Sequence, residues 1–235
     1  MIQNNEIKRK KYILSKILKN IFMFSFYFIY QIIILLFLQV FNIDTSNWNN
    51  IHKNIYLIST GIFYIIILVI VYSKELKDDY KESKSKLTNN VLKNIPIYIV
   101  GVLLMSLSNI IISKFTNSTI SENEINVRNY IQIFPVYMAF STIIYAPIVE
   151  EITFRKTFRN LISNKYLFII LSGMVFGLVH ISSNTSLNDF LMVIPYIIMG
   201  IDLSYIYYKT DTIYTTMIIH SLHNLILFIV QLIGG

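Results

Sequence analysis

The stretch IFMFSFYFIYQIIILLFLQVF, residues Ile21–Phe41, decides the fold class of this chain. It contains no charged residue over its whole length. A helix of about 20 mostly apolar residues spans the hydrocarbon core of a bilayer. The stretch is also too long for the apolar part of a cleavable signal peptide, and no small-residue cleavage site follows it. It therefore predicts a transmembrane helix.

Further apolar runs of similar length follow, separated by short polar segments. We expect helices at Ile55–Tyr72, about 95–112, from about Tyr130 onwards, 166–181, 190–207 and 213–233. The sequence therefore predicts an all-α polytopic membrane bundle of about seven transmembrane helices, within a range of six to eight. Residues 1–129 would form a basic N-terminal segment and the first three spans, and residues 130–235 a core of four helices that carry the motifs described below.

The composition supports a bilayer environment. Of the 235 residues, 54% are hydrophobic and 14% charged, whereas a soluble domain has about 25% charged residues. The absence of cysteine excludes a disulfide framework, a thiolate metal site and a cysteine nucleophile. The net charge of +7 comes from lysines at the ends of apolar runs, where they act as topology signals and contact anionic lipid. The expected partner is the lipid bilayer, and no nucleic acid is expected.

The distribution of cations predicts one orientation. The lysine-rich N-terminus, a lysine-rich loop at 74–86, the segment 155–165 and the turn at Lys209 fall on one side of the membrane. The loops at 42–54, 113–129 and 182–189 fall on the other side and carry few cations. By the positive-inside rule the N-terminus is cytoplasmic. The basic N-terminal residues are equally consistent with an amphipathic surface helix and with a flexible segment.

Ionisable side chains at membrane depth are costly and for that reason indicate function. The deep polar residues of this chain are Glu150, Glu151, His180, Asp202, His220, His223 and Asn224.

The first of three local patterns is Glu150-Glu151-x-x-x-Arg155. Glu151 and Arg155 are four residues apart on one helical face and can form an ion pair, which leaves Glu150 free about 100° around the helix. A purely structural role for this ion pair is equally open.

The second and third patterns lie on later helices. Phe176-x-x-x-His180 follows Gly173, which with Gly177 gives a helix face that allows close approach of another backbone. His220 and Asn224 are four residues apart and can point at one target. At about 1.5 Å of rise per residue, the four polar groups of the three motifs fall within about two helical turns of one level in an antiparallel bundle. The spacing therefore allows one shared site.

These three motifs in this order resemble the CPBP family, the CAAX proteases and bacteriocin-processing enzymes also called the Abi family, and in particular type II CAAX prenyl endopeptidases. The resemblance covers about residues 131–233. It implies an intramembrane endopeptidase in which Glu150 activates a water, while His180, His220 and Asn224 hold that water and stabilise the oxyanion. Glu151 and Arg155 would support them. Hydrolysis needs a base, a positioned water and a group that stabilises negative charge.

Two points stay open in this interpretation. Glu150, His180 and His220 could hold Zn²⁺ with an open coordination position, or the reaction could proceed without metal. His223 is more readily explained as structural, and Asp202 has no assigned role.

The resemblance also implies a substrate class. In a bacterial plasma membrane we expect a membrane-associated or lipidated peptide or protein, as in bacteriocin or pheromone maturation or in self-immunity. With the predicted topology, the site would open toward the cytoplasm or laterally into the bilayer.

The competing functions are a catalytically silent scaffold or immunity protein of the same fold and a small proton-relay transporter. The signatures of aspartyl, zincin-like and rhomboid-like intramembrane proteases are absent from the sequence.

Overall fold

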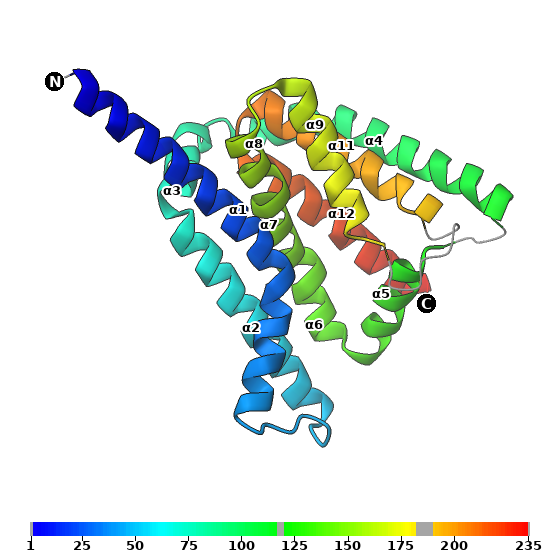
Figure 1. Ribbon diagram of the computed structural model, residues 1–235. Coiled ribbons are helices and arrows are strands. Elements are labelled where there is room, and N and C mark those ends of the chain that lie inside the picture. Colours follow the sequence, from blue (N-terminus) through cyan, green and yellow to red (C-terminus); the bar gives the residue numbers. More distant parts are fainter. Residues whose placement is uncertain (1, 117–119, 182–189, 235) are drawn as a thin grey trace.

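The computed structural model describes residues 2–116, 120–181 and 190–234 of the chain. These residues form an all-helical bundle without a β-strand (Figure 1), which confirms the predicted fold class. Segments labelled η are π-helices, which have a wider turn than an α-helix. The elements in chain order are α1 (Ile2–Val40), α2 (Asn50–Val71), α3 (Ser73–Ser83), α4 (Leu87–Thr116), α5 (Glu122–Ile133), α6 (Pro135–Phe140), η1 (Ser141–Tyr145), α7 (Ala146–Glu150), η2 (Glu151–Lys156), α8 (Thr157–Leu161), α9 (Lys165–Leu178), α11 (Ile194–Thr210) and α12 (Ile213–Gly234).

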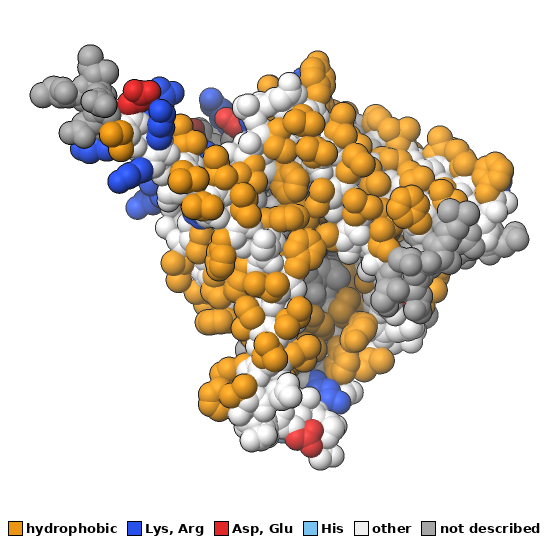
Figure 2. All heavy atoms as spheres, viewed as in Figure 1, with side chains coloured by type: hydrophobic (Ala, Val, Ile, Leu, Met, Phe, Trp, Pro, Cys, Tyr) orange, Lys and Arg blue, Asp and Glu red, His pale blue; other side chains and the backbone are white. Residues whose placement is uncertain are grey.

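Within the described part of the chain, four helices are long and apolar enough to cross a membrane: Asn5–Val40, Asn50–Val71, Leu87–Thr116 and Ile213–Gly234. The remaining passes are the shorter helices α9 and α11 and the rod 135–161, in which α6, η1, α7, η2 and α8 follow one another without a break. Counted with the four long helices, these elements are compatible with the prediction of about seven passes. Large apolar side chains cover most of the visible surface between the polar ends (Figure 2), as expected for a protein that faces lipid.

Two segments expected to be loops are helical. The lysine-rich segment forms α3, because Leu76, Asp79 and Ser83 recur at helical spacing and are buried against the bundle. Residues 122–133 form α5, which Ser121 caps by accepting a hydrogen bond from the backbone N–H of Glu124 at 3.1 Å. The fourth span consequently begins at Pro135 and not near Tyr130. The expected loop at 182–189 lies outside the described residues.

The basic N-terminus is the start of α1 and continues into the first span without a break. In the described residues it is therefore helical and is not separated from the first span by a break.

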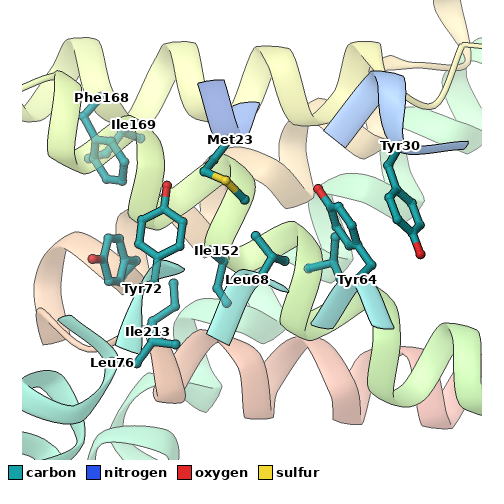
Figure 3. Packing of buried hydrophobic residues seen from close by; sticks show 12 residues of the cluster. Met23, Tyr30, Tyr64, Leu68, Tyr72, Leu76, Ile152, Phe168, Ile169 and Ile213 are labelled. Carbon is teal, nitrogen blue, oxygen red and sulfur yellow. The ribbon is translucent and has the colours of Figure 1, made fainter. Parts of the chain in front are cut away.

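The largest cluster of buried apolar side chains joins α1 and α2 to the later helices. Met23 and Tyr30 of α1 pack with Tyr64 and Leu68 of α2, and Ile152 of the rod completes the contact (Figure 3). Polar contacts reinforce this junction: Tyr72 donates a hydrogen bond to Asn20 Oδ1 at 2.9 Å, and its oxygen lies 2.8 Å from Thr157 Oγ1. The rod is thereby fixed on one side by α1 and α2, and its other side faces α9 and α12.

Candidate active site

Two adjacent glutamates of the rod point to different surroundings. Glu150 ends α7 and Glu151 begins the π-helical segment η2. The Glu150 side chain retains 15% of its exposure and lines a cavity, whereas the Glu151 side chain is fully buried. Single π-helical turns inside α-helices are often found at functional sites. The helix geometry therefore separates the two carboxylates as the one-residue offset predicts.

Glu151 and Arg155 form the expected ion pair. Arg155 Nη1 lies 3.2 Å from Glu151 Oε1, and both side chains are fully buried. The guanidinium also lies 4.2 Å from the centre of the Phe176 ring on α9 and 3.4 Å from the Gly200 carbonyl oxygen on α11. The pair thus connects the rod to both of these helices, behind the cavity wall.

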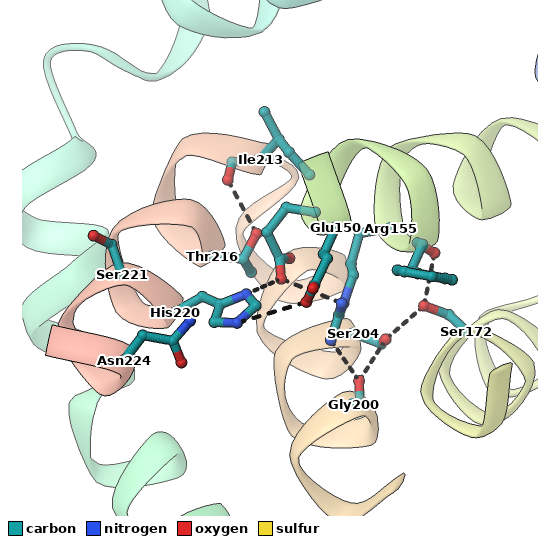
Figure 4. A network of polar contacts seen from close by, with 12 residues as sticks. Glu150, Arg155, Ser172, Gly200, Ser204, Ile213, Thr216, His220, Ser221 and Asn224 are labelled. Atoms are coloured by element: carbon teal, nitrogen blue, oxygen red, sulfur yellow. Dashed lines mark hydrogen bonds and ion pairs between the residues drawn. The ribbon is translucent and has the colours of Figure 1, made fainter. Parts of the chain in front are cut away.

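Glu151 also fixes the orientation of His220. The carboxylate can only accept, so the imidazole Nδ1–H donates to Glu151 Oε1, at 2.9 Å. The other nitrogen, Nε2, then carries a lone pair and lies 3.9 Å from Glu150 Oε2 (Figure 4). This distance is too long for a direct hydrogen bond, and it suits a bridging water.

His180 is held in a similar way at the end of α9. Its Nδ1–H donates to the carbonyl oxygen of Phe176 at 2.8 Å, because a carbonyl can only accept. The ring stacks on Tyr196 of α11, with 4.5 Å between ring centres and planes 16° apart. The free Nε2 therefore belongs to a ring whose orientation is fixed by two neighbours.

Asn224 lies one helical turn after His220 on α12. Its Nδ2 donates to the Thr142 carbonyl oxygen at 2.7 Å, and Ser221 donates to the Ile143 carbonyl oxygen at 2.6 Å. Both acceptors belong to η1, where the π-helical turn departs from the regular backbone hydrogen-bond pattern. The amide keeps one N–H and its oxygen for other partners.

The four candidate catalytic side chains line one cavity of about 480 Å³. They are Glu150, His180, His220 and Asn224. Glu151 and Arg155 are not part of its lining.

Three comparisons with known proteins bear on this site. Residues 132–226 match the family model described as "Type II CAAX prenyl endopeptidase Rce1-like". We call residues 132–226 the Rce1-like core. The match contains all three motifs and agrees with the resemblance that they carry.

The chain is also similar to three curated proteins, one of which is named as a peptidase. An uncharacterized protein of Mycoplasma capricolum is 30% identical over 80% of this chain, and the match covers 58% of that protein. The UPF0177 protein YbdI of Lactococcus lactis is 25% identical over 73% of this chain and 94% of its own length. A protein of Bacillus subtilis named "Putative membrane peptidase YdiL" is 30% identical over 48% of this chain and 44% of its own length. No solved structure matches the chain at a comparable level.

Two tyrosines in contact with histidines of the Rce1-like core were not found from the sequence. Tyr196 stacks on His180, and the Tyr98 hydroxyl lies 3.0 Å from His223 Nδ1. The chain has 17 tyrosines, so aromatic identity alone could not single out these two. Asp202 is separate from the Rce1-like site: it lies beside Gly101 in a groove between α4 and α11.

A zinc ion has suitable donor atoms in the Rce1-like core but no matching arrangement. The outward nitrogens of His220 and His180 are each oriented by a hydrogen bond at the opposite ring nitrogen, as is usual for zinc-binding histidines. Among the described residues, however, no group of three or more His, Asp or Glu side chains is placed to hold a metal ion. Zinc therefore stays a prediction, and no step below depends on it.

The cavity of the Rce1-like core extends in a direction that the sequence did not predict. Its lining includes Glu124 and Arg128 of α5, Asn109 in the second half of α4 and Gln231 near the end of α12. None of its lining residues comes from α3 or from the segment 155–165. Among the described residues the lining therefore does not reach the lysine-rich side, which disagrees with the first of the two expected openings, and the lateral opening into the bilayer stays a prediction.

Proposed function

We propose that this chain is a membrane-embedded endopeptidase that hydrolyses a peptide bond with a water activated by Glu150. The observation that supports it most directly is the convergence of Glu150, His180, His220 and Asn224 on one cavity inside an apolar bundle. Ionisable groups are costly in that environment. Their convergence, together with the Rce1-like match, favours catalysis over a proton path across the membrane.

The water would lie between Glu150 Oε2 and His220 Nε2, which are 3.9 Å apart. Glu150 takes one proton from this water as its oxygen attacks the peptide carbonyl carbon, and later passes that proton to the leaving amine nitrogen. The water's second hydrogen is held by His220, whose orientation depends on Glu151.

Negative charge then develops on the former carbonyl oxygen and needs hydrogen-bond donors. Asn224 has one amide hydrogen left after its bond to Thr142. His180 keeps a lone pair on Nε2 while its Nδ1–H donates to Phe176, so Nε2 can accept a hydrogen bond from the water or from a substrate N–H and does not itself bind the oxyanion. Both side chains are pre-oriented by backbone carbonyls, so little reorganisation is required.

The decisive variant is Glu150→Gln, which keeps the shape of the side chain and removes the base. We would assay cleavage of a quenched fluorescent peptide library by the purified protein in detergent. His180→Ala is the second variant, and Glu82→Gln is the control, since Glu82 is an exposed carboxylate on α3. We expect both site variants to lose about 10²-fold or more of the activity, whereas the control retains it.

Each variant is also melted in detergent, so that a loss of activity can be separated from unfolding. Cleavage by Glu150→Gln at the wild-type rate would overturn the mechanism. If the folded wild-type protein cleaves nothing in the library, the catalytically silent scaffold or immunity protein becomes the better interpretation. The metal content and chelator sensitivity of the same preparation decide between the zinc-dependent and metal-free versions of the mechanism.

We further propose bacteriocin or pheromone maturation, or self-immunity, as the cellular role.

A further inference from the structure

We propose that the catalytic cavity is reached from the extracytoplasmic face of the membrane, so that the substrate is a peptide segment already presented on that face. The inference rests on the proposed peptidase function for its chemistry. The side of access itself depends on separate observations, namely the location of the cations and the direction of the cavity.

The cations gather at one end of the bundle. Of the 20 Lys and Arg residues, 16 lie there and three, Lys53, Lys114 and Arg128, lie toward the other end, while Arg155 is buried between them. The 16 are six residues between positions 8 and 19, five between 74 and 86, and Lys93, Lys156, Arg159, Lys165 and Lys209.

Tertiary contacts show that these segments, although distant in sequence, share one end. Lys19 of α1 pairs with Glu75 of α3. Lys156 of the rod lies 3.3 Å from Asp79 Oδ2 of α3. The same Asp79 oxygen accepts a hydrogen bond from the backbone N–H of Ile213, at 3.1 Å, where α12 begins. We call this region, formed by α3 and the chain segments in contact with it, the basic end.

The cavity extends away from the basic end. Beyond the catalytic residues its lining includes residues of α5, of the second half of α4, of the first half of α11 at Tyr196, and of the final turns of α12 at Gln231. In Figure 1, α5 and the C-terminus lie at the opposite end of the bundle from α3 and the turn between α8 and α9. We therefore place the mouth of the cavity beside the polar residues Glu124 and Arg128 of α5.

The side facing the basic end is filled. Ile152 and Phe154, which follow the two glutamates along the rod toward the basic end, are fully buried. Behind them lies the Glu151–Arg155 pair, whose side chains are also fully buried. The described residues therefore leave the catalytic groups open toward α5 and closed toward the basic end.

The positive-inside rule orients the molecule. The rule counts Lys and Arg near the ends of spanning helices, and 16 against three is a strong asymmetry. The basic end then lies in the cytoplasm, and the mouth beside α5 lies on the outer face. Arg128, one of the three cations on that side, is paired with Glu124 at 2.9 Å.

This orientation changes the expected substrate class. A cytoplasmic precursor cannot reach the catalytic groups before export. A peptide that has crossed the membrane, or an outward-facing segment of another membrane protein, can enter beside α5. These two sources share the same chemistry, a peptide backbone delivered from the outer face.

The absence of native cysteines allows a direct test by single-cysteine labelling. Asn126→Cys places a thiol on an exposed position of α5, and Ser85→Cys places one on an exposed position after α3. Intact cells are treated with a membrane-impermeant maleimide, and both variants are labelled again after permeabilisation to show that each thiol is reactive. We expect Asn126→Cys to react in intact cells and Ser85→Cys to react only after permeabilisation.

The reverse pattern, or equal labelling of both thiols in intact cells, would overturn the proposed side of access. The labelling needs no enzymatic activity, so it can succeed even if the chain proves not to be a peptidase. Once the library yields a cleaved peptide, the same peptide is added to sealed membrane vesicles. Cleavage by right-side-out vesicles and not by inverted vesicles is the expected result, and the opposite preference would contradict the proposal.

Discussion

At the scale of single residues, the proposed catalytic base and the buried ion pair beside it lie in different surroundings. Glu150 faces the cavity, and its neighbour Glu151 is buried with Arg155 and His220. A buried charge that loses its partner is strongly destabilising, whereas a carboxylate at a cavity wall can be neutralised at little structural cost. The two adjacent glutamates should therefore respond differently to the same substitution.

We expect Glu151→Gln to lower the free energy of unfolding by about 3–5 kcal/mol, because Arg155 would remain buried without a counter-charge. Glu150→Gln should leave the stability nearly unchanged while it removes activity. Thermal melting of both variants in one detergent, beside the cleavage assay, makes the comparison. Equal melting temperatures for the two variants would show that Glu151 does not have the supporting role assigned to it.

Tyr196 provides a second prediction at this scale. Its hydroxyl lies 3.0 Å from Ser121 Oγ and accepts a hydrogen bond from Asn123 Nδ2 at 3.3 Å, while its ring stacks on His180. Tyr196→Phe keeps the stacked ring and removes the link to α5, so we expect a higher KM with kcat nearly unchanged. Tyr196→Leu also removes the stacking and should lower kcat. If kcat falls equally in both variants, the ring has no separate role in positioning His180.

At the scale of elements, the close contact of α9 and α11 positions His180 relative to the rest of the site. The small-residue face expected at Gly173 and Gly177 packs directly on α11. A Cβ atom at Gly177 would lie 2.7 Å from the backbone nitrogen of Ile197, and one at Gly173 would lie 2.6 Å from that of Ile201. Backbone atoms cannot move aside as a flexible side chain can, so the two helices would have to separate.

We expect Gly177→Ala to destabilise the protein by about 1–3 kcal/mol, the usual cost of overpacking, and to lower activity by displacing His180. Gly234→Ala is the matched control, because no heavy atom lies within 4 Å of a Cβ at that position. Melting curves and cleavage rates of the pair provide the measurement. Wild-type behaviour of Gly177→Ala would mean that the helices tolerate a wider spacing.

At the scale of the whole molecule, ion pairs at the basic end attach α1 to the rest of the bundle. Burial disfavours the charged form of Glu75, but the hydrogen bond and charge of Lys19, with Lys156 nearby, outweigh it and hold the pKa of Glu75 below its ordinary value of 4.5. Because the folded state lowers this pKa, the pair stabilises the fold above the unfolded-state pKa. Its contribution is lost as the pH falls through the folded-state value.

We therefore expect the melting temperature to fall between about pH 5 and pH 3, and Glu75→Gln to remove part of this fall. Glu82→Gln, which changes an exposed carboxylate on the same helix, should leave the pH dependence as in the wild type. Melting curves at a series of pH values measure the effect. Identical curves for the wild type and Glu75→Gln would show that this pair does not contribute.

The sequence alone determined the all-helical membrane class and carried the Rce1-like resemblance of its second half, because long uncharged apolar runs and ordered motifs are local features of a chain. It also predicted the Glu151–Arg155 pair and the glycine face, since four-residue spacing on a helix fixes a shared side. It missed α3 and α5, where capping and amphipathic spacing outweighed a polar composition.

Only the tertiary structure decided how the motifs meet. Glu151 orients His220 across 69 residues, and Tyr196 connects His180 to α5 through contacts with no sequence signature. The direction of the cavity likewise depends on which helix ends pack together. Such contacts depend on helix rotation and on the π-helical segments of the rod, and a periodic pattern of residue types specifies neither.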